Sequence, residues 1–129
     1  MRPLLAVLAL SLATAPLAAQ SNAERILNDH YTRSHDYDLI HQDIEVRDFD
    51  WDSLGLKGRV ATTLVALRPG MDSVILDAGH RIHVAQVRGA TGTLDFGQRG
   101  DTLVGHLAHA AGFGDTVRFA ITYDARIDN

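Results

Sequence analysis

The sequence contains no cysteine, and this absence removes several kinds of chemistry at once. A chain without thiols forms no disulfide, supplies no thiolate ligand for zinc and has no cysteine nucleophile. Its 129 residues, of which 46% are hydrophobic, are enough for one domain with a core of its own. We therefore expect a single domain that folds without covalent cross-links.

Lysine and glutamate are almost absent as well: Lys57 is the only lysine, and Glu24 and Glu45 are the only glutamates. The formal net charge is −4, and the arginines are spread along the chain. Proteins that bind nucleic acid usually concentrate positive charge in a run or on one element. The sequence therefore gives no indication of a nucleic-acid partner.

The scarcity of glutamate also bears on catalysis. A helix-borne zinc peptidase site needs two histidines one turn apart with a glutamate between them, and neither glutamate here adjoins a histidine. No serine lies in a nucleophile-elbow pattern, and Ser34-His35-Asp36 are neighbours that cannot form a proton relay. We expect a polar loop there, and no catalytic, cofactor-binding or metal-binding residue in this chain.

Histidine, by contrast, is frequent, and two pairs share one spacing: His80 with His83, and His106 with His109. On a strand, residues three apart point to opposite faces, so neither pair is arranged in advance for one metal ion. Neutral imidazole nevertheless binds zinc, copper and nickel. A small periplasmic metal-binding protein that uses these histidines therefore stays open as an alternative.

Aspartates also recur at short spacing, as in Asp48, Asp50 and Asp52. Such a run can begin a calcium loop, but the glycine after the third aspartate and the distal glutamate of that loop are missing. We expect 48–53 to be a solvated acidic loop.

The first nineteen residues have the layout of a secretory signal peptide. One positive charge at Arg2 precedes an apolar run over 4–12, and small residues follow up to Ala18 and Ala19. The apolar run is too short to span a bilayer comfortably. We expect cleavage after Ala19 or Ala15, export to the periplasm or the extracellular space, and no membrane contact afterwards. An uncleaved N-terminal anchor is the alternative.

Residues 20–36 are predicted to be a linker or a short helix. Ser21 followed by Glu24 fits a capping box, although the apolar face that would follow is thin.

From Tyr37 onward the pattern is one of short strands with turn signals between them. The predicted strands cover 37–47, 59–67, 73–77, 82–87, 93–96, 102–107 and 116–123. The predicted turns include Arg68-Pro69-Gly70, Ala78-Gly79, a tight hairpin connection at 98–101 and a loop at 108–115. About seven strands with no helical period between them predict an all-β, antiparallel β-sandwich over 37–129.

Individual strands carry finer expectations. The shared parity of Ile40, Ile44 and Val46 predicts a half-buried first strand. Both parities of 59–67 are apolar, which predicts a central strand covered on both faces. We also expect an irregularity near Ala85.

The order of these strands resembles the saddle-like N-terminal β domain of the aminopeptidase N family of zinc metallopeptidases, over about residues 37–127. The resemblance rests on 37–46, on the glycine before an alternating run in 56–64, on the apolar strand ending in Asp77, on 82–87, and on the strand that ends in Tyr123. One departure is Ala125, which stands where that family commonly has glycine.

This resemblance implies a non-catalytic domain that packs on its own downstream catalytic domain and walls the site for the N-terminus of a peptide substrate. In that family the zinc, its ligands and the exopeptidase loop lie downstream, so zinc is expected in a part that this chain does not include. The β-sandwich would then be incomplete at its C-terminal end, and the isolated chain would be marginally stable or prone to self-association. The rival hypothesis is a stand-alone secreted β-sandwich module that binds peptide or carbohydrate.

Overall fold

The computed structural model describes residues 33–126. The expected signal peptide at 1–19 and most of the expected linker or short helix at 20–36 lie outside the described residues. Every regular element in the described part is a β-strand, so the all-β prediction is confirmed.

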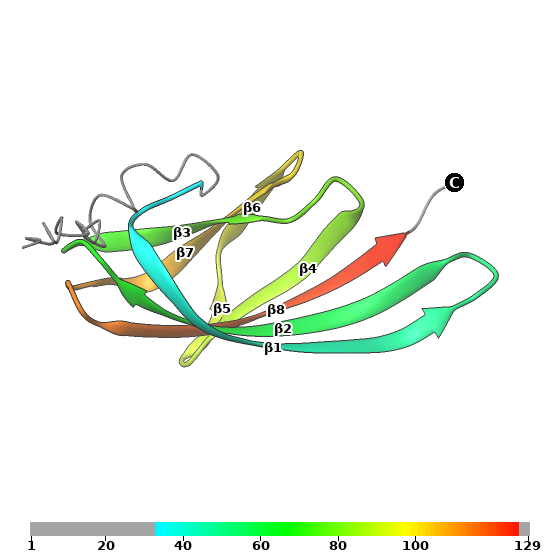
Figure 1. Ribbon diagram of the computed structural model, residues 1–129, viewed down its shortest axis with the longest axis horizontal. Coiled ribbons are helices and arrows are strands. Elements are labelled where there is room, and N and C mark those ends of the chain that lie inside the picture. The colour runs from blue at the N-terminus through cyan, green and yellow to red at the C-terminus, as the bar shows by residue number, and fades with distance from the viewer. Residues whose placement is uncertain (1–32, 127–129) are drawn as a thin grey trace, which may run out of the picture.

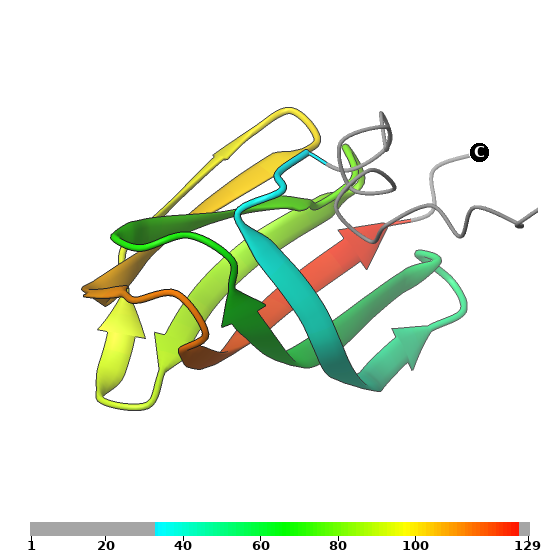
Figure 2. The same cartoon turned by 60° about the vertical axis from the view of Figure 1, so that its left-hand side comes forward.

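Eight strands follow one another along the chain (Figure 1): β1 Tyr37–Asp50, β2 Gly55–Ala66, β3 Met71–Asp77, β4 Ile82–Gly89, β5 Gly92–Leu94, β6 Phe96–Arg99, β7 Thr102–Ala111 and β8 Thr116–Arg126. They form a five-stranded sheet of order β1-β2-β8-β4-β5 and a three-stranded sheet of order β3-β7-β6. Every strand pairing is antiparallel. The two sheets face each other, as a β-sandwich requires (Figure 2).

The core lies between the two sheets, where apolar side chains alternate with outward-facing polar ones. Its largest fully buried members are Leu64 on β2, Met71 and Val74 on β3, and Val87 on β4. The amide of Gln98 also joins the sheets: its Nε2 donates to the carbonyl oxygen of Ile82 at 2.6 Å, and its Oε1 accepts from the amide of Val84 at 3.0 Å. A side chain of β6 thus takes the place of a paired strand beside β4.

Polar contacts attach the start of β1 and the residues before it to the three-stranded sheet and its turns. Arg33 forms ion pairs with Asp77 and with Asp101, the latter at 2.7 Å, and the Tyr37 hydroxyl donates to the carbonyl oxygen of Ile75 at 2.6 Å. Burial, followed by the nearby carboxylate of Asp77, raises the pKa of Tyr37. These contacts fix where β1 enters the larger sheet.

Several strand boundaries differ from the sequence-based prediction. β1 continues to Asp50 and β7 to Ala111, so parts of the loops expected at 48–53 and 108–115 are extended strand. The strand expected at 93–96 is divided between β5 and β6, which belong to different sheets. A strand pattern marks extended backbone, but the partner of a strand decides where pairing ends.

The irregularity expected near Ala85 is confirmed by a register shift between Val84 and Gln86. The prediction that 59–67 is covered on both faces is only half correct. The strand is central, between β1 and β8, but on its outer face Arg59 is exposed and Ala61 is only half-buried.

One buried polar atom in the core provides a test of the packing. Thr62 is 2% exposed, and its Oγ1 has no hydrogen-bond partner in the described part of the chain. A buried hydroxyl without a partner costs free energy that a methyl group of the same shape does not. We predict that Thr62→Val raises the free energy of unfolding by about 1 kcal/mol.

Chemical denaturation measures this change, and Leu64→Ala serves as the opposite control. Removing that fully buried side chain should lower the free energy of unfolding by about 2–5 kcal/mol. A loss of stability in Thr62→Val would show that the hydroxyl has a partner in the native protein.

Candidate functional site

Exposed large hydrophobic residues are concentrated along one strand and in the turn that follows it. Seven are exposed within residues 33–126, and six of them lie on β1 or in the turn that follows it. They are Leu39, Ile40, Ile44, Val46, Phe49 and Trp51. Ile44 is 62% exposed and Val46 56%, so the prediction of a half-buried first strand is wrong. An apolar patch of this kind commonly marks an interaction surface.

The strand register places two members of this patch, Ile44 and Val46, on the inner face of the larger sheet. Ile44 lies opposite Val60, which lies opposite the buried Ile121; Val46 lies opposite Gly58, which lies opposite Tyr123. Residues directly opposite each other in a sheet point to the same side. Ile44 and Val46 therefore continue the face that forms the core.

Burial decreases along this face because the smaller sheet covers only part of it. On β2, Leu64 is fully buried, whereas Val60 and Leu56 are half-buried. In Figure 1 the β1–β2 hairpin extends past the strands of the smaller sheet. We name the uncovered part the open face, formed by Ile44, Val46, Leu56, Val60 and Tyr123.

The floor of the open face depends on one glycine. A Cβ atom at Gly58 would lie 2.3 Å from Cζ and 2.4 Å from the hydroxyl oxygen of Tyr123. The aromatic ring therefore lies directly against the backbone of β2, which only a residue without a side chain allows. This close approach explains the glycine that precedes the alternating run in the sequence.

We predict that Gly58→Ala lowers the free energy of unfolding by about 1–3 kcal/mol, because the Tyr123 ring must leave its place. In the Tyr123→Ala background, Gly58→Ala should lower the free energy of unfolding much less, since the obstructing ring is gone. A double-mutant cycle by chemical denaturation measures the coupling between the two positions. Equal costs in both backgrounds would contradict the proposed contact.

The turn between β1 and β2 is ordered by a carboxylate. Asp50 accepts hydrogen bonds from the Ser53 hydroxyl at 2.6 Å and from the amide of Asp52 at 2.9 Å. These bonds, led by the one from Ser53, lower the pKa of Asp50. The rings of Phe49 and Trp51 meet edge to face, with centroids 4.4 Å apart. The turn thus presents Trp51, which is 79% exposed, at the tip of the hairpin.

A group whose pKa is lowered in the folded state contributes stability above its unfolded pKa, and that stability is lost as pH falls through the folded pKa. We predict that the Asp50 carboxyl group titrates below the ordinary range of aspartate, and that Ser53→Ala moves its pKa upward. A carbon-detected NMR titration of the aspartate side chains measures both values. An unchanged Asp50 pKa in Ser53→Ala would show that the hydroxyl does not hold it.

The calcium alternative finds no support in this geometry. The Asp50 carboxylate is occupied by its own turn, and Asp48 lies 3.6 Å from the ammonium group of Lys57. At 34–36, the Ser34 hydroxyl oxygen accepts a hydrogen bond from the amide of Asp36, whose carboxylate pairs with Arg68 at 2.8 Å. That segment is a polar turn of the kind expected.

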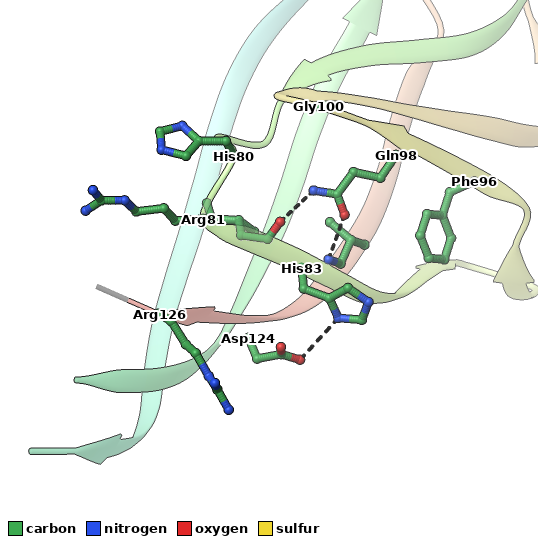
Figure 3. A pocket seen from close by; sticks show the side chains of 10 residues that line it. His80, Arg81, His83, Phe96, Gln98, Gly100, Asp124 and Arg126 are labelled. Carbon is green, nitrogen blue, oxygen red and sulfur yellow. Dashed lines mark hydrogen bonds and ion pairs between the residues drawn. The ribbon is translucent and has the colours of Figure 1, made fainter. Parts of the chain in front are cut away.

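A polar cleft of about 850 Å³ lies where β4 and β8 approach the β6–β7 hairpin (Figure 3). His80, Arg81, His83, Phe96, Asp124 and Arg126 are among its lining residues. The Nδ1 atom of His83 is 3.5 Å from Asp124, its partner across the sheet. The Gln98 amide is already used by β4, so it offers no free hydrogen-bonding group to a ligand.

The two histidine pairs lie in different parts of the fold, one at the start of β4 and one on β7. His80 and His83 line the polar cleft, whereas His106 and His109 are exposed on β7. Within residues 33–126 no group of three or more histidine, aspartate and glutamate side chains could hold a metal ion. The metal-binding alternative therefore gains no support from the described residues.

The part of the chain that the structure describes contains no helix that is long and apolar enough to cross a membrane.

Comparisons with known proteins find similar folds among solved structures, but no match by sequence. No protein-family model and no curated protein matches the chain. Among solved structures, an M1 zinc metallopeptidase from Deinococcus radiodurans, bound to a Tyr-Ser-Ala substrate, is similar with a TM-score of 0.63 and 19% identity over 73% of this chain. Yeast LTA4 hydrolase in complex with bestatin is similar with a TM-score of 0.57 and 23% identity over 69% of this chain.

Legionella pneumophila aminopeptidase A in complex with aspartic acid gives a TM-score of 0.54 at 16% identity. The match covers 21% of the Deinococcus chain, 14% of the yeast chain and 11% of the Legionella chain. The fold is therefore one that forms a part of M1 zinc metallopeptidases. The resemblance seen in the sequence is confirmed at the level of the fold.

Proposed function

We propose that this chain is the non-catalytic N-terminal β domain of an exported zinc aminopeptidase, and that its open face packs against polypeptide that follows it. The observation that carries the proposal is a core face that continues without a cover. Ile44 and Val46 belong by register to the face that buries Ile121, yet both are more than half exposed. Apolar surface of this kind is stabilised by removal from water.

The fold supports the same conclusion, because the similar structures are peptidases of which this chain spans about a fifth or less. The rest of such a protein would complete the sandwich and supply the chemistry. The domain would then act by position, as one wall of the site that receives the N-terminus of a peptide substrate.

The residues of this chain do not fit a zinc site of their own. The sequence lacks a glutamate between paired histidines, and the described residues hold no group of three candidate ligands. Zinc would be held entirely by the downstream part. We propose that the signal-like segment at 1–19 directs export and is removed before the protein reaches the periplasm or the extracellular space.

A stand-alone exported binding module is the second candidate, and the polar cleft favours it. Phe96 offers an apolar surface beside the imidazole of His83 and the carboxylate of Asp124. Such a mixture suits a sugar ring or a short peptide. This candidate requires saturable binding that is lost in His83→Ala, and it does not require the open face to be covered.

The DNA beyond the codon for Asn129 decides between these functions. The proposal expects a continuing reading frame that encodes a histidine-glutamate zinc motif, and a product that releases N-terminal amino acids from peptides in a zinc-dependent way. A stop codon at that position would overturn the aminopeptidase proposal and leave the binding module.

Two substitutions in that longer product test the open face. We predict that Ile44→Asp combined with Val46→Asp lowers its aminopeptidase activity at least tenfold and lowers its melting temperature, because two charges would be buried at the contact. Phe113→Asp is the matched control, since Phe113 is 72% exposed in the β7–β8 turn, away from the open face. Equal effects of the control and the double variant would contradict a contact at the open face.

A further inference from the structure

Three arginines gather on the outer face of the larger sheet, the side turned away from the smaller sheet. Arg59, Arg88 and Arg118 come from β2, β4 and β8, and all three are exposed. Together they line a shallow hollow of about 430 Å³. None of their side chains makes a hydrogen bond or an ion pair within residues 33–126.

The strand register explains how residues so far apart in the sequence meet. Ala120 of β8 lies between two partners at the centre of the sheet: Ala61 on the neighbouring strand β2 and Arg88 on the other neighbouring strand, β4. Arg118 lies two residues before Ala120 on β8, and Arg59 lies two residues before Ala61 on β2. Because the two strands are antiparallel, these arginines flank the Ala61–Ala120 pair in opposite directions along the strands. By ordinary sheet spacings, the Cα atoms of Arg88 and Arg118 are about 8 Å apart, and those of Arg59 and Arg118 about 14 Å. Flexible arginine side chains can reach across these distances to one ligand.

Small side chains form the floor between the three cations. Ala61, Thr63, Ala120 and Thr122 all line the hollow, and none of them is long enough to fill it. The floor leaves room for a group of a few atoms to approach the sheet while the guanidinium groups surround it.

Acidic neighbours do not neutralise this cluster. On the same face, Glu45 lies opposite Arg59 on β1, but its carboxylate contacts Arg47 at 2.5 Å. Asp43 lies opposite Ala61, one strand beyond the central pair. No acidic residue lines the hollow itself. In a chain whose formal net charge is −4, three unpaired cations on one patch form a local positive field that attracts anions.

We propose that this arginine hollow binds a phosphate or sulfate group. Each guanidinium group presents a planar fork of N–H donors that matches two oxygens of an oxyanion. Three forks can surround a tetrahedral dianion, whereas a single carboxylate has only two oxygens to offer. Because the hollow is shallow and open, the bound group is the end of a ligand or a free ion rather than an enclosed molecule. The hollow and the open face lie on opposite sides of the sheet, so both can be occupied together.

The full chain should be titrated with inorganic phosphate while the arginine Nε–Hε resonances are followed by NMR. We expect saturable shifts at Arg59, Arg88 and Arg118. The variant R59Q/R88Q/R118Q should lose at least tenfold in affinity. Replacement of the same three residues by lysine should also weaken binding, because the charge remains but the fork is lost. Thermal melts should be unchanged, since the side chains are exposed; if the triple variant fails to fold, R88Q alone serves.

R99Q is the control for R88Q, since it removes the same charge from an exposed arginine on β6, in the smaller sheet. Co-sedimentation with vesicles of phosphatidylcholine containing phosphatidylglycerol, at physiological salt, distinguishes the source of the group. Binding of free phosphate supports a site for a small ion. Binding to these vesicles alone, lost in R59Q/R88Q/R118Q, supports a lipid headgroup. The proposal is overturned if neither probe binds, or if R99Q weakens binding as much as R88Q does.

Discussion

The larger sheet is longer than the layer that covers it, and the rest of the structure follows from this mismatch. Where β3 and β7 lie over the sheet, Leu64, Val74 and Val87 are buried almost completely. Farther along the same face, the register continues through Val60 to Ile44, and no covering strand from the described residues remains. Since a sheet buries apolar surface only against a second layer, one end of this domain is a core and the other end is an uncovered apolar face.

Contacts within the hairpin order the open face, although no strand of the described residues covers it. The Tyr123 ring rests on Gly58, and the Asp50 carboxylate closes the β1–β2 turn through its bonds to Ser53 and Asp52. At the other end of β1, Arg33 and Tyr37 attach the entering chain to the smaller sheet. The open face is therefore a preformed surface, and preformed surfaces lose little conformational entropy when they are covered.

The two faces of the larger sheet differ in chemistry. Its inner face is mainly apolar, whereas its outer face has small residues at the centre and unpaired arginines around them. A domain placed beside a catalytic unit can use both, one face for attachment and the other for a ligand.

The sequence by itself determined the all-β class, the positions of most strands along the chain and the absence of a zinc peptidase motif, because alternation, turn residues and motif spacing are local properties. Tertiary structure alone decided that Ile44 and Val46 stay exposed, since parity identifies the face of a strand but not whether a second layer covers it. The same holds for Arg59, Arg88 and Arg118, which are separated in the sequence and meet only because β8 pairs between β2 and β4. Strands that pair can be far apart in the sequence, so the local pattern of one strand does not show which strand it pairs with.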